Sequence, residues 1–175
     1  MIYRNKEKQV FAKAKSIKLL LLDVDGVLTD GKLYFSNSGE ESKAFNSLDG
    51  HGIKMLQAAG IEVGIITGRT SKLVQKRAGD LGITLLYQGR EDKLIAMQEV
   101  ITNSDYQQNQ IAYVGDDLPD APAIAAAGVG FTVANCHADL QEIADVQTTL
   151  SGGSGAVREV CDYILKAQGL YPTHG

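Results

Sequence analysis

The segment 17–22 ends in four consecutive leucines, Leu19 to Leu22, and it constrains the fold more than any other part of the chain. A strand buried on both faces of a parallel sheet shows such an uninterrupted apolar run, without alternation of polar residues. Two carboxylates, Asp23 and Asp25, follow directly. Because carboxylates are costly to bury without a partner, the end of this strand is where we expect a functional site.

Further apolar segments alternate with stretches of helical periodicity, which predicts an α/β fold. We expect a doubly wound, Rossmann-like parallel sheet with helices on both faces, and one domain over 1–175. The polar, turn-rich segment around Asn37-Ser38-Gly39 predicts a small β-hairpin insertion at about 32–46, with no cap domain. A glycine-rich joint opens the C-terminal tail, about 151–175. We expect strands at 17–22, 61–66, 83–87, 111–114, 129–133 and 146–150, and helices at 50–59, 71–81, 91–101, 124–127, 138–144 and 156–168.

The composition excludes several function classes. The formal net charge of −4 gives no general basic field, so we expect neither a nucleic acid nor a membrane surface as partner. The first sixteen residues are polar and basic and do not resemble a secretory signal, so we expect a cytoplasmic protein. Cys136 and Cys161 lack metal-site spacing and are expected to be reduced thiols.

Polar residues follow several predicted strands, and the carboxyl ends of parallel strands meet at one edge of a sheet. These residues are Asp23 and Asp25, the Thr67-Gly68-Arg69 segment, and Gly115-Asp116-Asp117 with Asp120, while Lys93 opens a predicted helix. Each motif alone also fits a turn, a helix cap or a solvated charge. Together they suit phosphoryl transfer, in which Mg²⁺ offsets the repulsion of clustered carboxylates, one carboxylate attacks phosphorus and another moves a proton.

In this order, DVDGVLTDG, TGR, a lone lysine and GDDLPD resemble the four motifs of the haloacid-dehalogenase-like phosphatases. The resemblance implies Asp23 as nucleophile, Asp25 as general acid/base, and Mg²⁺ held by Asp23, the Asp25 backbone carbonyl and Asp116. It also implies that Thr67 and Lys93 bind the phosphoryl group. Either Asp117 or Asp120 would support the metal. Asp30, seven residues past Asp23, is expected to be a turn residue.

The short hairpin, the LDGHGIKML segment, TGRTSKLVQKRAGDLGI and GGSGAVREVCDYILKAQG are together similar to one group within the capless branch of this family. That group acts on 3-deoxy-D-manno-octulosonate 8-phosphate in lipopolysaccharide precursor synthesis. The resemblance implies a phosphorylated sugar acid as substrate and a homotetramer in which neighbouring subunits cover each site. Two positions depart from the family: Lys54 stands where an arginine is usual, and Ser154 stands where a basic residue is usual. The implied substrate contacts are Asp25, Asn46, Ser47, Leu48, Asp49, Gly50, Lys54, Gly68, Arg69, Arg77 and Lys93.

Three alternatives remain open at this stage. The same chemistry would serve a nine-carbon, sialic-acid-type 9-phosphate, although Arg69 favours the eight-carbon acid. A non-catalytic phospho-acceptor domain also combines clustered acids with a threonine and a lysine, but with the acceptor aspartate later in the chain. A capless relative retained only as an oligomerisation module is the third. His51 is either a site residue or a polar residue at a helix start, and His137 and His174 have no expected role.

Overall fold

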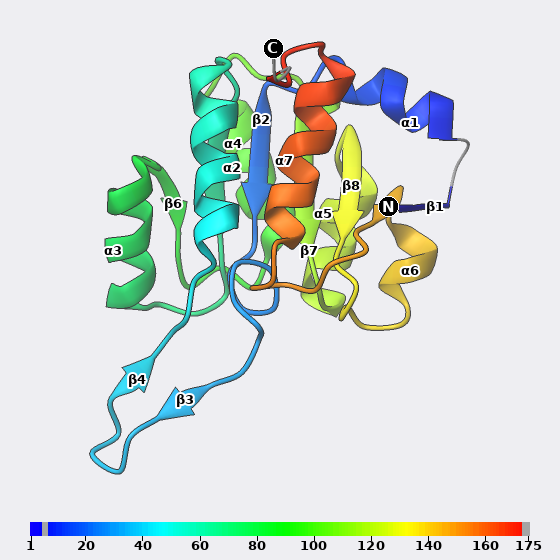
Figure 1. Ribbon diagram of the computed structural model, residues 1–175. Coiled ribbons are helices and arrows are strands. Elements are labelled where there is room, and N and C mark those ends of the chain that lie inside the picture. Colours follow the sequence, from blue (N-terminus) through cyan, green and yellow to red (C-terminus); the bar gives the residue numbers. More distant parts are fainter. Residues whose placement is uncertain (5–6, 173–175) are drawn as a thin grey trace.

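The computed structural model describes residues 1–4 and 7–172, and its centre is a seven-stranded sheet (Figure 1). Neighbouring strands are parallel, except that β1 pairs antiparallel with β9 at one edge. The predicted α/β fold with a parallel sheet is therefore confirmed, except for one antiparallel edge strand that was not predicted. In spatial order the strands are β1 (Ile2–Tyr3), β9 (Val146–Gln147), β8 (Val129–Thr132), β7 (Ile111–Gly115), β2 (Leu19–Leu22), β5 (Glu62–Ile66) and β6 (Leu85–Tyr87).

Strand β2 lies inside the sheet, between β5 and β7, and all four of its leucines are buried. Leu20 and Leu22 belong to one hydrophobic cluster, while Leu19 and Leu21 belong to another on the opposite face. Because successive side chains of a strand point to opposite faces, a strand covered on both faces must be apolar at every position. This is the physical reason for the uninterrupted leucine run.

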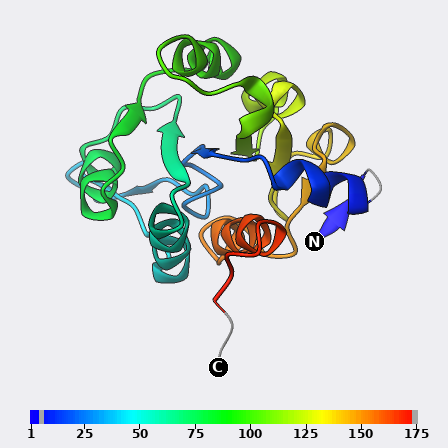
Figure 2. The ribbon, with the colours of Figure 1, turned by 90° about the horizontal axis from the view of Figure 1, so that it is seen from above.

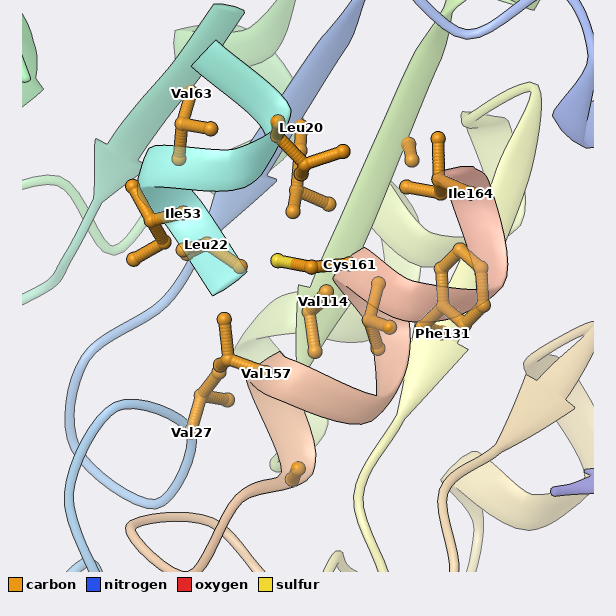
Figure 3. Close-up of a cluster of buried hydrophobic side chains, with 14 of the residues drawn as sticks. Leu20, Leu22, Val27, Ile53, Val63, Val114, Phe131, Val157, Cys161 and Ile164 are labelled. Atoms are coloured by element: carbon orange, nitrogen blue, oxygen red, sulfur yellow. The ribbon is translucent and has the colours of Figure 1, made fainter. Parts of the chain in front are cut away.

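Helices cover both faces of the sheet, as Figure 2 shows from above. The first cluster lies under α1, α2, α3 and α7, and Figure 3 shows the side chains of α2 and α7 meeting those of the sheet there. The second cluster lies under α4, α5 and α6. The helices are α1 (Glu7–Ala14), α2 (Ser47–Ala58), α3 (Lys72–Leu81), α4 (Lys93–Thr102), α5 (Ala121–Ala126), α6 (Leu140–Ile143) and α7 (Ala156–Ala167), with short 3-10 turns η1 (Gln108–Gln110) and η2 (Leu118–Asp120).

The predicted hairpin is present as β3 (Tyr34–Phe35) and β4 (Glu41–Ser42), which pair antiparallel. Its turn contains Gly39 at φ 82°, a left-handed conformation that glycine adopts without strain. The hairpin extends away from the body of the molecule on the side where the strands of the sheet end (Figure 1). Among residues 1–4 and 7–172, it is the only strand pair outside the seven-stranded sheet.

Two parts of the fold differ from the sequence-based expectation. The first sixteen residues, for which no element was predicted, include β1 and α1, and the α1 residues Val10 and Ala14 are buried in the first cluster. Helix α2 begins at Ser47 rather than at 50, because the Asn46 side chain accepts a hydrogen bond from Leu48 N at 2.8 Å and caps it.

The C-terminal part of the chain bears on two further predictions. The last predicted strand, 146–150, is confined to β9. Residues 173–175 of the predicted tail, with His174, lie outside the described residues. Within 1–4 and 7–172, no helix combines the length and apolar character needed to cross a membrane.

Candidate active site

A cavity of about 370 Å³ opens at the carboxyl ends of the central strands. Most of the residues predicted to perform chemistry line it, which shows that the register of the sheet brings these distant segments together. The lining residues are Asp23, Asp25, Gly31, Thr67, Gly68, Arg69, Glu91, Lys93, Asp116, Asp117, Pro119 and Asp120.

The strand ends position these side chains through backbone hydrogen bonds. Asp23 N donates to Val114 O at 3.0 Å, which extends the β2–β7 ladder by one residue, and Thr67 N donates to Tyr87 O at 2.9 Å. Gly26 then turns the chain away from the cavity at φ 92°, and a Cβ at that position would collide with the Asp116 carboxylate. Glycine is therefore required there for both its conformation and its size.

Three carboxylates, of Asp23, Asp116 and Asp120, form the centre of the cavity, with one oxygen from each lying within 4.8 Å of the others. Burial, followed by the Asp120 charge, raises the pKa of Asp23 to about 6. Burial, followed by the Asp23 charge, raises the pKa of Asp116 to about 7. The like charges thus destabilise one another in the absence of a cation.

Lys93 offsets part of this repulsion from the first turn of α4. Its Nζ lies 2.9 Å from Asp23 Oδ1 and donates to Asp120 Oδ1 at 3.0 Å. The side chain is only 3% exposed. Burial alone would lower the pKa of Lys93, but the carboxylates of Asp23 and Asp120 raise it above its ordinary value. The ammonium therefore stays charged although the side chain is buried.

Asp117 and Asp120, between which the sequence left the support of the metal open, differ in their positions. Asp120 is 1% exposed and accepts hydrogen bonds from Tyr113 OH at 2.8 Å and from Asp116 N at 3.1 Å. Asp117 instead caps η2, accepting from Leu118 N at 2.8 Å. Asp120 is thus the residue built into the carboxylate cluster.

The cluster fits a hard divalent cation. Asp23 Oδ1 is buried and, apart from its ion pair with Lys93, accepts no hydrogen bond from the described residues. One ammonium does not neutralise three clustered carboxylates, and oxygen-rich sites are those that Mg²⁺ prefers. The donor set is entirely oxygen, with no cysteine or histidine within it.

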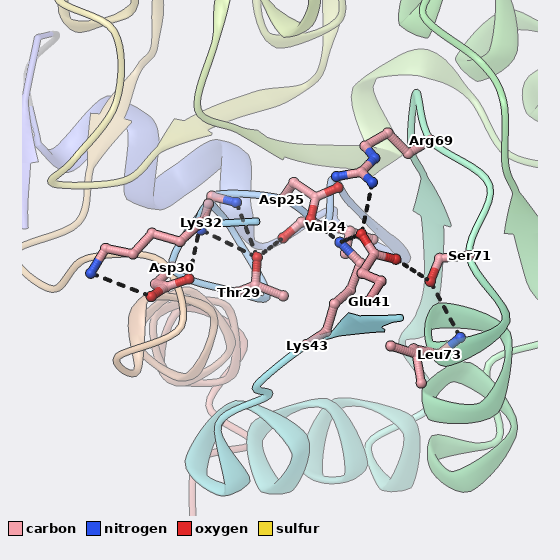
Figure 4. A network of polar contacts seen from close by, with 12 residues as sticks. Val24, Asp25, Thr29, Asp30, Lys32, Glu41, Lys43, Arg69, Ser71 and Leu73 are labelled. Atoms are coloured by element: carbon pink, nitrogen blue, oxygen red, sulfur yellow. Dashed lines mark hydrogen bonds and ion pairs between the residues drawn. The ribbon is translucent and has the colours of Figure 1, made fainter. Parts of the chain in front are cut away.

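The sequence analysis missed two residues at the base of the hairpin. Glu41 Oε1 accepts a hydrogen bond from Arg69 at 2.7 Å, and Lys43 bonds the Asp25 carboxylate (Figure 4). Arg69 therefore lines the cavity as predicted, but it is paired with the hairpin. A hairpin with little core contact gives no periodic signal in the sequence, so these two charges looked solvated.

The segment Asn46 to Gly50, which the family resemblance implies as a substrate contact, forms the first turn of α2 and does not line the cavity. Asp49 is 1% exposed and accepts a hydrogen bond from Arg158 N at 2.8 Å, at the start of α7. Ser47 and Leu48 are exposed, and Asn46 donates to Gly153 O at 3.2 Å. The segment thus joins α2 to the C-terminal tail.

Two predicted cations, Lys54 and Arg77, also lie away from the cavity in this chain. Lys54 Nζ donates to Leu81 O at 2.6 Å, near the end of α3. Arg77 lies over the ring of Phe45 and donates to Asn46 O at 3.3 Å. Both side chains bind backbone carbonyls of their own chain, which gives each a structural role.

The remaining residues singled out in the sequence lie in a turn or on the surface. Asp30 accepts hydrogen bonds from Lys32 N at 3.0 Å and from Tyr34 OH at 2.6 Å, so its predicted turn role is confirmed. His51 is exposed on α2, and Ser154 is exposed in the tail.

Comparison with known proteins places these features in a family. The family model of the haloacid dehalogenase-like hydrolases matches residues 33–128. The 3-deoxy-D-manno-octulosonate 8-phosphate phosphatase KdsC of Escherichia coli K12 is 52% identical over 160 residues, which cover 91% of this chain and 85% of that protein.

Solved structures with similar sequences point to the same family. The phosphatase of the same name from Moraxella catarrhalis, in complex with magnesium, phosphate and KDO, is 44% identical with a TM-score of 0.92, and the match covers 94% of each chain. The cobalt-bound phosphatase from Haemophilus influenzae is 43% identical with a TM-score of 0.86, covering 90% of this chain and 92% of that one. This chain belongs to the haloacid dehalogenase-like hydrolases.

Proposed function

We propose that the protein is a Mg²⁺-dependent phosphatase that hydrolyses 3-deoxy-D-manno-octulosonate 8-phosphate to the free sugar acid and phosphate, in lipopolysaccharide precursor synthesis. The observation that carries this proposal is the cluster of Asp23, Asp116 and Lys93 in a cavity that also contains Asp25. Relatives that are 44–52% identical over most of the chain bear the name of this activity.

In the proposed reaction a carboxylate oxygen of Asp23 attacks phosphorus, and the bond from phosphorus to the sugar oxygen breaks. Asp25 donates a proton to that departing oxygen. Asp25 then removes a proton from the water that hydrolyses the aspartyl-phosphate, which returns both residues to their starting states. Thr67, which is 2% exposed, and Lys93 bind the phosphoryl oxygens.

The metal site is proposed to consist of the Asp23 carboxylate, the Asp25 backbone carbonyl and the Asp116 carboxylate. When bound, Mg²⁺ supplies positive charge to phosphoryl oxygens during transfer. Asp120 supports this site through its bonds to Lys93 and to Asp116 N.

For the sugar acid itself, we assign recognition to Gly68 and Arg69, which line the cavity next to Asp25. Arg69 presents a planar guanidinium, which matches the geometry of a carboxylate. Asn46 to Gly50, Lys54 and Arg77 are not assigned a substrate role, because their contacts are within the fold.

We further propose a homotetramer in which hairpins of neighbouring subunits assemble. The support is an exposed apolar group on the hairpin, where Leu33, Tyr34 and Phe35 are 51%, 43% and 60% exposed. A patch of this kind on an extension is typical of an interaction site. A cytoplasmic location is proposed alongside, because Cys136 and Cys161 are free thiols.

The test is phosphate release over a panel of phosphate esters with Mg²⁺ present. The eight-carbon sugar-acid 8-phosphate should give the highest kcat/KM. A higher value for a nine-carbon sialic-acid-type 9-phosphate would replace the proposed substrate. Stable labelling of Asp23 without phosphate release would instead support the phospho-acceptor alternative, and sedimentation of the same protein measures its oligomeric state.

A further inference from the structure

The base of the hairpin contains a buried ammonium group. The neighbouring strand residues Tyr34 and Phe35 are largely exposed, yet the side chain of Lys43 is only 2% exposed. Removing a lysine charge from water costs several kcal/mol unless the charge is paired and hydrogen-bonded. Folding of a peripheral hairpin does not require a buried ammonium group. The partners of Lys43 therefore indicate the function of this side chain.

The principal partner is the proposed general acid/base. Lys43 Nζ donates a hydrogen bond to Asp25 Oδ1 and lies 3.7 Å from Glu41 Oε1 (Figure 4). Within residues 1–4 and 7–172, no other side chain bonds the Asp25 carboxylate. One Asp25 oxygen is thus held by the hairpin, while Oδ2 has no side-chain partner in the described chain.

Glu41 fixes strand β4, which leads directly into Lys43. It accepts a hydrogen bond from Arg69 at 2.7 Å and another from Ser71 Oγ at 3.3 Å. Ser71 is itself the cap of α3, where its side chain accepts from Leu73 N. Strand β4 is therefore tied to the segment after β5 as well as to Asp25, which limits the movement of Lys43.

We infer that Lys43 is a positioning residue that holds Asp25 Oδ1, so that Oδ2 alone exchanges the proton with the leaving oxygen and with water. A neutral carboxyl and a carboxylate both accept a hydrogen bond at Oδ1, so the contact persists while the proton on Oδ2 is donated and regained. This inference rests on the proposed function, because it requires Asp25 to act as general acid. Fixed orientation of such a group is worth up to about 10²-fold in rate.

A purely structural role for Lys43 makes a different prediction. If Lys43 only secures the hairpin, its loss lowers activity toward every phosphate ester by the same factor. If Lys43 positions the proton donor, its loss lowers activity mainly toward esters with poor leaving groups. An alkyl phosphate needs a proton on its departing oxygen, whereas p-nitrophenyl phosphate does not. The ratio of kcat/KM for the two esters separates the roles, because kcat/KM covers the steps up to formation of the aspartyl-phosphate.

The experiment compares Lys43→Met with Lys32→Met, a matched control on the same hairpin whose side chain is 73% exposed and pairs only with Asp30 at 3.7 Å. With Mg²⁺ present, we expect Lys43→Met to reduce kcat/KM for the alkyl phosphate by about 10–10²-fold, within the 10²–10⁴-fold range of general acid catalysis. For p-nitrophenyl phosphate the reduction should be less than about 3-fold, since no proton is needed. Lys32→Met should change neither value. Lys43→Gln, which keeps most of the packing with a shorter side chain, gives the same readout should Lys43→Met not fold.

Asp25→Asn distinguishes failure of this inference from failure of the proposed function. If Asp25→Asn leaves the ratio of the two esters unchanged, Asp25 is not the proton donor and the proposed mechanism fails. If Asp25→Asn changes the ratio but Lys43→Met does not, only the role of Lys43 is refuted. In the Asp25→Asn background, Lys43→Met should produce no further change in the ratio, and an additive change would also overturn the inference.

Discussion

Replacing Asp49 with alanine tests whether this residue belongs to the fold or to the substrate pocket. The N-cap of α7, Gly155, has no side chain to bind the free N–H groups of the first turn. Asp49 supplies that function from α2, since its Oδ1 accepts from Arg158 N at 2.8 Å and its side chain is buried. We therefore expect Asp49→Ala to reduce stability rather than substrate affinity.

The magnitude follows from these contacts. Loss of an N-terminal capping side chain costs about 0.5–2 kcal/mol, and a buried N–H left without a partner costs about 1–3 kcal/mol. These two costs describe the same lost bond, and removal of a buried charge offsets part of them, so we expect a net loss of about 2 kcal/mol. For a chain of this size the corresponding fall in Tm is about 4–8 °C.

Thermal unfolding and steady-state kinetics of three variants provide the assay. Asp80→Ala is the surface control, because Asp80 is 51% exposed and pairs only with Lys76. Asp49→Asn keeps the acceptor for Arg158 N and should not lower Tm at pH 7. A wild-type Tm in Asp49→Ala together with a KM raised at least about 10-fold, equivalent to about 1.4 kcal/mol of lost binding, would refute the reasoning and restore Asp49 to the pocket.

The same carboxyl predicts a pH dependence. Burial raises the pKa of Asp49, an effect that the N–H groups of Arg158, Gly155 and Val157 only partly reverse. The folded state therefore holds this proton more tightly than the unfolded state. The resulting stabilisation is fully present below the unfolded pKa of about 3.9 and is lost as pH rises through the folded pKa. Asp49→Asn, which cannot ionise, should gain stability relative to the wild type as pH rises from 4 to 7.

Three further predictions concern neighbouring groups. Asp23→Asn should abolish phosphate release while leaving Tm within about 2 °C of the wild type, a shift below 1 kcal/mol; measurable turnover would contradict its role as nucleophile. Asp120→Ala leaves Lys93 and Tyr113 OH without this acceptor, so Tm should fall by an amount equivalent to about 3 kcal/mol, whereas Asp120→Asn should retain most of the stability. Lys54→Met removes the bond to Leu81 O and should cost about 1 kcal/mol; a changed KM in that variant would assign Lys54 to substrate binding.

The centre of the candidate site was predictable because it depends on the backbone alone. Asp23, Asp116 and Lys93 each follow or open an element whose apolar pattern is clear in the sequence, and parallel strands necessarily end at one edge. The β2–β5 and β2–β7 registers, in which Leu22 lies beside Ile65 and Val114, then align the segments that follow. No knowledge of side-chain packing was required.

The residues that were missed, and those that lie away from the cavity, depend on packing that the sequence does not display. Helix α2 begins three residues earlier than its periodicity indicated, which turns Asp49 inward toward α7. Lys43 and Glu41 lie on a hairpin whose partners are distant in sequence, so neither spacing nor periodicity marks them. The α1 residues Val10 and Ala14 provide only two buried positions in a polar segment, too few for a clear pattern.

The charges of the cavity lead to a final prediction about the order of binding. Six carboxylates line it against two cations, and both cations, Lys93 and Arg69, are already paired with acids. A phosphate dianion therefore meets net negative charge unless a divalent cation occupies the carboxylate cluster first. By linkage, the factor by which Mg²⁺ tightens phosphate must equal the factor by which phosphate tightens Mg²⁺. Calorimetry of each with and without the other should give equal factors of at least about 10, within the usual 5–150-fold range of coupling. Phosphate binding of equal strength after exhaustive chelation would mean that Lys93 and Arg69 alone neutralise the anion, which their existing ion pairs argue against.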